Sequence, residues 1–217
     1  MDDSTAAPSE HKQVQDKIDF DLGNTKKVSP FSIACQRGHL ATVELLLKYS
    51  DQIDFNSVDD GSNSALYHVC SQNRVKVAEL LISHPDVDPY ASSGSWTPLF
   101  AACARGCDEI VRLLLTHHAL DLRDESSKGR TVLWIAAHNG RREVVKVLMA
   151  SGKNLAVEER IPDEEEGEKK KGMTAKEAAK DQNFEDIAEL IEKYEQDRTK
   201  SIIDFRKELG IEGTNPF

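Results

Sequence analysis

A complete short helix, with its start and stop signals, is contained in the stretch Trp96-Thr-Pro-Leu-Phe-Ala-Ala-Cys-Ala-Arg-Gly106. Thr97 suits the N-cap, because its hydroxyl can accept from a backbone N–H of the first turn; losing such a cap costs about 0.5–2 kcal/mol. Pro98 suits the first helical position, which needs no N–H. Gly106 suits the left-handed conformation in which helices commonly end. The stretch therefore predicts a helix of about two turns between Thr97 and Gly106.

The same nine-residue spacing from a hydroxyl to a helix stop occurs five times in the chain. The five pairs are Ser29 and Gly38, Ser64 and Asn73, Thr97 and Gly106, Thr131 and Gly140, and Thr174 and Asn183. Successive N-caps lie 35, 33, 34 and 43 residues apart. A period of about 33 residues is typical of an array of helical pairs rather than of one globular core.

A second apolar run follows each short helix. The five runs are Val43-Glu-Leu-Leu-Leu47, Ala78-Glu-Leu-Leu-Ile82, Val111-Arg-Leu-Leu-Leu115, Val145-Lys-Val-Leu-Met149 and Ala188-Glu-Leu-Ile-Glu192. Their apolar residues recur on one side of a helix, which predicts a second, amphipathic helix in each copy. One helical pair cannot bury that side alone, whereas stacked neighbours can, and such stacking stabilises solenoids.

These repeats resemble the ankyrin-repeat family, whose core pattern is T-P-L-H-x-A-A-x-x-G. The resemblance is carried by Trp96–Gly106, by Ser29-Pro-Phe-Ser-Ile-Ala-Cys-Gln-Arg-Gly-His39 and by Thr131-Val-Leu-Trp-Ile-Ala-Ala-His-Asn-Gly140, and it spans about residues 24–195. The copy beginning Ser64-Ala-Leu-Tyr-His-Val-Cys is the most divergent. The resemblance implies an all-α solenoid of stacked helix-turn-helix units joined by β-hairpin-like fingers. It also implies a concave face that holds protein partners, and no intrinsic catalysis.

The chain divides into eight predicted segments: 1–23, an acidic segment with the end of a preceding repeat; 24–58, 59–91, 92–125 and 126–157, four repeats; 158–172, a charged finger insertion; 173–195, a capping repeat; and 196–217, a helix and tail. The cap has Lys176, Lys180 and Glu192 where earlier copies are apolar. A terminal repeat has no following neighbour, so its outer face must be polar. The insertion favours a solvated loop over a binding element. Ile202, Ile203, Phe205 and Leu209 predict a helix that packs back on the array.

The N-terminal segment leaves two interpretations open. Ile18-Asp-Phe-Asp21 resembles Ile53-Asp-Phe-Asn56, the finger that ends the first full copy, but no apolar helix precedes it. Either residues 5–17 cover the first repeat, or the chain is an excerpt of a longer array, and we favour the excerpt.

Composition excludes several function classes. The 217 residues include 28 basic and 38 acidic ones, for a net charge of −10, and the acidity lies in the flanks. Duplex binding needs a cationic surface, so we expect no nucleic-acid ligand. Without an apolar run of roughly 20 residues, we expect no membrane insertion. Four cysteines without a secretory signal pattern indicate free thiols and a cytoplasmic or nuclear location.

No reactive constellation is evident, so we expect neither an enzyme nor a cofactor or metal site. Cys35, Cys70 and Cys103 share one position of the repeat, which favours packing over zinc binding. His117-His118 falls in a turn, where adjacent imidazoles rarely bind one ion, and no nucleophile has a base at a suggestive spacing.

The partner site that the resemblance implies consists of the residue before each N-cap and the two residues before each helix stop. From these positions we predict contacts by Arg37, Asn63, Gln72, Trp96, Arg105, Arg130, His138 and Asn139. Trp and Arg dominate binding energies, and the first four copies place no carboxylate at these positions. We therefore expect an acidic partner segment, held by an adaptor or by an inhibitory subunit that blocks an enzyme; the alternative is a set of solvated residues without one ligand.

Two further motifs have competing interpretations. Tyr67, Phe100 and Trp134 recur once per copy, and we expect packing between repeats rather than an aromatic strip for a ligand. At the C-terminus, Asn215, Pro216 and Phe217 form a motif that resembles the short sequence bound by EH domains. Pro216 favours a turn after Asn215, which would present the Phe217 ring. The resemblance implies an EH-domain partner, although a match of only three residues also arises by chance.

Overall fold

The computed structural model describes residues 23–91, 96–116, 122, 130–160 and 172–211. Within these ranges the chain forms eleven α-helices and one 3₁₀ helix. They are α1 (Pro30–Arg37), α2 (Leu40–Leu46), η1 (Leu47–Tyr49), α3 (Ala65–Ser71), α4 (Val75–Ser83), α5 (Pro98–Arg105), α6 (Asp108–Leu115), α7 (Val132–His138), α8 (Arg142–Ala150), α9 (Ala175–Asp181), α10 (Glu185–Gln196) and α11 (Arg198–Glu208).

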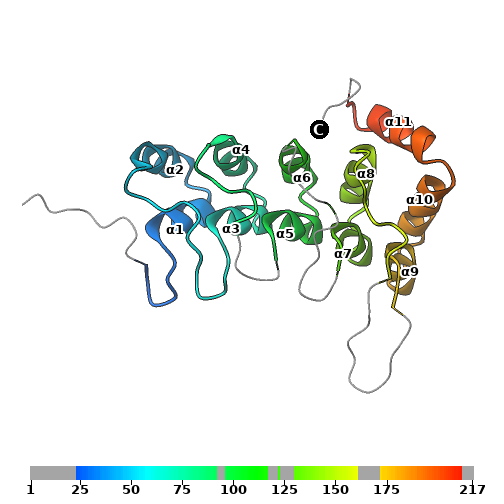
Figure 1. The fold of residues 1–217 in the computed structure, drawn as a ribbon, viewed down its shortest axis with the longest axis horizontal. Helices are drawn as coiled ribbons and strands as arrows, with labels where there is room; N and C mark the ends of the chain where they lie inside the picture. The colour runs from blue at the N-terminus through cyan, green and yellow to red at the C-terminus, as the bar shows by residue number, and fades with distance from the viewer. Residues whose placement is uncertain (1–22, 92–95, 117–121, 123–129, 161–171, 212–217) are drawn as a thin grey trace, which may run out of the picture.

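The helices form an elongated, two-row array (Figure 1). The first helices of the copies, α1, α3, α5, α7 and α9, make one row, and each packs on the next. The second helices α2, α4, α6 and α8 make the other row, and each also contacts the first helix of its own copy. The predicted solenoid of helical pairs is confirmed. Strand-like pairing among the described residues is limited to one antiparallel bridge, between Val58 and Ser64.

All five predicted N-caps are confirmed. The side-chain oxygens of Ser29, Ser64, Thr97, Thr131 and Thr174 each accept from the backbone N–H three residues ahead. Thr174 forms a full capping box, because Glu177 also accepts from the Thr174 N–H at 2.9 Å. Each first helix is therefore fixed at its start by its own sequence.

The helix stops are left-handed, as predicted: φ is positive at Gly38, Asn73, Gly106, Gly140 and Asn183. At Gly140 a second constraint acts, because a Cβ there would lie 2.5 Å from Cζ of Phe184, the first residue after the next stop. A glycine at this position thus permits both the turn and the close approach of the next copy.

The core is continuous along the array. Cys35, Cys70 and Cys103 are fully buried, which confirms their packing role. Phe100 and Trp134 are also buried and Tyr67 is half-buried, so these aromatic positions serve packing between repeats. Burial raises the pKa of the Cys35 thiol to about 12, which keeps it protonated and unreactive.

The C-terminal helix α11 packs on α8 and α10, as its amphipathic pattern predicts (Figure 1). Phe205 is buried, whereas Ile203 is exposed. In the capping repeat, Lys180 and Glu192 are exposed, and Lys176 pairs with Glu195.

Replacing Gly140 by Ala should destabilise the array by about 2–5 kcal/mol, because a left-handed backbone and overpacking are both penalised. Gly210→Ala is the matched control: φ is 64° there against 70° at Gly140, but no atom lies within 4 Å of the added Cβ. Urea unfolding followed by circular dichroism measures both. Equal losses for the two variants would contradict a steric role for Phe184.

Candidate partner-binding surface

The predicted partner residues fall into two groups by exposure. Arg37, Gln72, Trp96 and Arg105 are exposed, and Trp96 retains 43% of its surface. Asn63, Arg130, His138 and Asn139 are half-buried. All eight lie at the ends of the first helices or directly before them, so stacking of these helices arranges them in sequence along the array.

Electrostatic contacts link neighbouring copies on this surface. Burial raises the pKa of Tyr67, while Arg105 of the next copy lowers it and Asp59 raises it. The phenol of Tyr67 therefore lies within range of both charges. Further along, the Asn139 side-chain amide donates to the carbonyl of Ala104, at 3.4 Å.

Trp134 organises two of the predicted residues. The His138 ring stacks on the indole with a centroid distance of 4.7 Å and an interplanar angle of 14°. The Arg130 guanidinium lies 4.8 Å from the centre of the indole ring. Trp134 itself is only 5% exposed. Arg130 and His138 are thus held by a buried ring, whereas Trp96 contacts Phe100 edge-on and keeps an open face.

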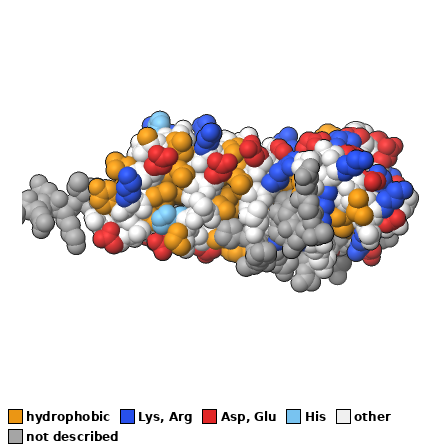
Figure 2. Space-filling view, turned by 90° about the horizontal axis from the view of Figure 1, so that it is seen from above, with side chains coloured by type: hydrophobic (Ala, Val, Ile, Leu, Met, Phe, Trp, Pro, Cys, Tyr) orange, Lys and Arg blue, Asp and Glu red, His pale blue; other side chains and the backbone are white. Residues whose placement is uncertain are grey.

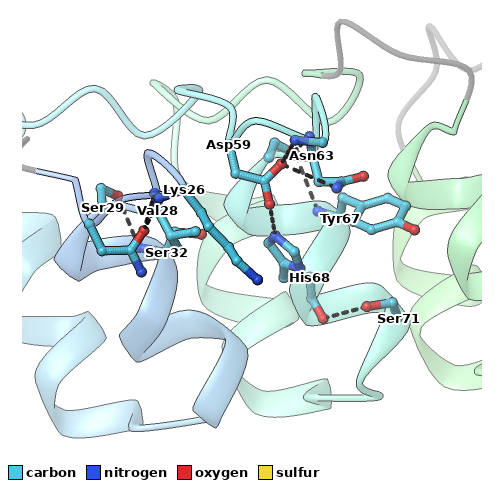
Figure 3. Close-up of polar contacts among 12 residues, drawn as sticks. Lys26, Val28, Ser29, Ser32, Asp59, Asn63, Tyr67, His68 and Ser71 are labelled. Carbon is cyan, nitrogen blue, oxygen red and sulfur yellow. Dashed lines mark hydrogen bonds and ion pairs between the residues drawn. The ribbon is translucent and has the colours of Figure 1, made fainter.

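An acidic finger residue that the sequence analysis did not select reaches this surface (Figure 3). The Asp59 carboxylate lies 2.8 Å from Nε2 of His68 and accepts from the N–H groups of Gly61 and Asn63. The Asn63 side-chain amide also donates to it, at 3.2 Å. Burial opposes ionisation of Asp59, but these hydrogen bonds outweigh it and lower the pKa.

This contact assigns new roles to His68 and Asn63. His68 is half-buried, and it packs as the partner of a finger carboxylate rather than as an apolar substitute. The available signal was a polar residue where other copies have Ile33, Ala101 and Ile135. Because Asp59 contacts both Asn63 of the finger and His68 of helix α3, the finger is fixed relative to that helix (Figure 3).

From the second copy onward, the residue after the helix stop contacts the preceding copy. Arg74 donates from Nε to the Gln36 carbonyl at 3.1 Å, and Arg141 donates in the same way to Ala104 at 3.1 Å. At the equivalent position, the Cys107 thiol contacts the Cys70 carbonyl at 3.3 Å. These side chains satisfy carbonyls at the end of the preceding first helix. Their shared register in the repeat was a signal that the sequence analysis did not use.

A shallow pocket lies at the C-terminal end of the array, lined by Arg160, Met173, Glu177, Lys180 and Asp181. Arg160 forms a two-bond ion pair with Glu177, at 2.8 Å for each bond, and donates to the Gly172 carbonyl at 2.7 Å. Arg160 therefore closes the base of the charged insertion. Residues 161–171 of that insertion lie outside the described residues.

The described residues contain no group of three or more His, Cys, Asp and Glu side chains placed to hold a metal ion. None of the helices in this part of the chain has the length and apolar character needed to cross a bilayer.

Three of the predicted features fall outside the described residues. They are the N-terminal segment through Leu22, the His117-His118 pair, and the C-terminal motif of Asn215, Pro216 and Phe217. The expectations about all three features, including the turn at Pro216, stay predictions.

Several proteins share this repeat sequence. Ankyrin repeat and SOCS box protein 11 of Danio rerio is 40% identical over 106 residues, which are 48% of this chain and 34% of that protein. The probable E3 ubiquitin-protein ligase XBOS33 of Oryza sativa is 30% identical over 118 residues, 54% of this chain and 22% of its own length. The putative ankyrin repeat protein YahD of Escherichia coli is 27% identical over 132 residues, 58% of this chain and 64% of that protein.

The chain thus covers about a third or less of the first two relatives, and the similarity lies in the repeats. A family model described as ankyrin repeats (3 copies) matches residues 6–93 and 85–159. This match spans most of the chain, and it agrees with the capped helical pairs and left-handed stops described above. The chain belongs to the ankyrin-repeat family.

Proposed function

We propose that this chain is a non-catalytic adaptor that binds an acidic segment of another protein along the surface formed by its fingers and first helices. Its ankyrin repeats indicate a protein–protein interaction module, which supports such a role. The observation that carries the proposal is the placement of exposed Arg37 on the first copy and of exposed Trp96 and Arg105 on the third, along one row of stacked first helices, without a carboxylate at the equivalent positions of the first four copies.

The chemistry of these side chains favours carboxylates. Arg binds carboxylates through two parallel hydrogen bonds, which are stronger than hydrogen bonds between neutral groups. Trp96 offers a large apolar area beside them. The finger carboxylate that reaches this surface, Asp59, is held by His68 and Asn63 and has little exposed surface, 12% of its side chain. Its oxygens are therefore already engaged by groups of this chain.

Rigid presentation supports binding. Helix caps, the Arg74 and Arg141 contacts and the Asp59–His68 pair hold fingers and helices together before any partner arrives. Side chains that are ordered beforehand lose less conformational entropy on association. The mechanism we propose is therefore docking onto a preformed surface.

A regulatory subunit that covers the active site of an enzyme would use the same surface. The two functions differ in a measurable consequence, because an inhibitor lowers the rate of its purified partner in proportion to occupancy, whereas an adaptor leaves it unchanged. The buried free thiols support the cytoplasm or nucleus as the location we propose.

The C-terminal motif of Asn215, Pro216 and Phe217 supports an EH-domain protein as a further candidate partner. Deleting residues 215–217 should abolish binding to a purified EH domain. Unchanged binding after the deletion would remove that proposal.

Reversing the charges in a triple variant, Arg37→Glu, Arg105→Glu and Arg130→Glu, should weaken capture of acidic partners at least about tenfold, since each charged contact is worth more than 1 kcal/mol. Quantitative pull-downs and titration of recovered peptides measure this. A triple variant at exposed sites outside this surface, Lys48→Glu, Lys76→Glu and Lys200→Glu, is the control with the same change in net charge. Equal losses in both would mean that the contact is non-specific.

Two tryptophans should separate binding from stability. Trp96→Ala should weaken partner binding and change the free energy of unfolding by less than about 1 kcal/mol, because this side chain is largely exposed. Trp134→Ala should destabilise the chain by about 3–5 kcal/mol, because it empties a buried site. Urea unfolding and a binding titration on each variant test the assignment. It is wrong if Trp96→Ala lowers mainly the stability and Trp134→Ala lowers only the binding.

A further inference from the structure

The outer helices have an equivalent apolar position whose exposure changes along the array. It is occupied by Leu45, Leu80, Leu113 and Val147 of α2, α4, α6 and α8. Leu45 is 53% exposed, Leu80 and Leu113 are partly exposed, and Val147 is fully buried. Val147 lies on α8, the helix on which α11 packs. Toward the N-terminus, hydrophobic side chains remain visible among charged ones over the outer helices (Figure 2).

Helix α11 shows how this face is covered. Lys146 of α8, beside Val147, pairs with Glu208 of α11 at 3.0 Å. Arg206 donates from Nε to the Ala150 carbonyl at the end of α8, at 2.8 Å. Arg112 of α6 reaches the Leu209 carbonyl at 3.3 Å. The end of α11 thus points from α8 toward α6, where the apolar row continues with the partly exposed Leu113.

Two charged positions beside the row have opposite signs on α8 and α4. On α8, Glu143 and Lys146 lie 3.6 Å apart, and Lys146 faces Glu208. The equivalent positions of α4 hold Lys76 and Glu79, both exposed. On α2, Glu44 again stands where α8 has Lys146. A helix that covered α4 and α2 as α11 covers α8 would therefore need a basic residue where α11 has Glu208.

We propose that the outer face of α2 and α4, centred on Leu45 and Leu80, binds an amphipathic helix of a partner protein that presents a Lys or Arg to Glu79. Two observations support this occupant: the row continues from the α8–α11 interface, and the position that pairs with Glu208 on α8 is acidic on α4 and α2, where Glu79 and Glu44 stand. The site is separate from the Arg37–Trp96–Arg105 surface, and Glu79 favours a basic rather than an acidic side chain in the partner. One chain can then hold an acidic segment on its first helices and a basic helix on its second helices.

The probes are two synthetic peptides with the sequence of residues 198–211, one native and one with Glu208→Lys, titrated against the full chain by fluorescence anisotropy. The Lys peptide should bind about tenfold more tightly than the native peptide, the factor given by one favourable charged contact. The chain variant Glu79→Lys should reverse that preference. Glu185→Lys, an equal charge change at an exposed position on α10, should leave it unchanged.

A second chain variant, Leu45→Asp with Leu80→Asp, should abolish binding of the Lys peptide while circular dichroism shows an intact fold, because neither side chain belongs to the buried core. The proposal is overturned if neither peptide binds saturably, or if Glu79→Lys and Glu185→Lys act alike. It is also overturned if crosslinking places the peptide on α8. If the peptide binds only after residues 212–217 are deleted, the C-terminal tail is the occupant and the proposal is wrong. If it binds only after a dimer is diluted, the occupant is a second copy of the chain.

Discussion

Each helical pair of this chain completes the burial of its apolar side only against its neighbouring pairs, and the other features of the structure depend on that constraint. The equivalent leucines Leu81, Leu114 and Leu148 have no exposed surface, whereas Leu46 in the first described pair is only partly buried. At the other end, α11 supplies the missing neighbour by packing on α8 and α10. Stability in such an array is the sum of contacts between adjacent units, so its ends need special treatment.

Stacking also requires that successive copies keep one register. The N-cap hydroxyls and left-handed stops determine where each first helix begins and ends, and the residue after the stop attaches it to the preceding copy. Arginine, cysteine and phenylalanine all occupy this last position. Their common role is to reach backward over the end of a helix, by a hydrogen bond at Arg74, Cys107 and Arg141 and by ring contact at Phe184.

A rigid array has two long faces, and here they present different side chains. The first helices and fingers present Arg37, Trp96 and Arg105, and their acidic neighbour Asp59 is held by hydrogen bonds. The second helices present leucines beside Glu44 and Glu79. Since both faces are fixed by the same stacked core, binding on one would not require rearrangement of the other. This arrangement fits the proposed role of an adaptor.

The sequence by itself determined the helical pairs, because N-caps, stops and the amphipathic period are local signals that each copy repeats. It also predicted the packing role of Cys35, Cys70 and Cys103, since equivalent positions share an environment. Only the tertiary structure decided that Asp59 reaches His68, that Arg74 and Arg141 join copies, and that α11 covers Val147 while leaving Leu45 exposed. These contacts join residues of different elements, so they depend on how stacking orients neighbouring helices and fingers, and spacing along the chain does not contain that orientation.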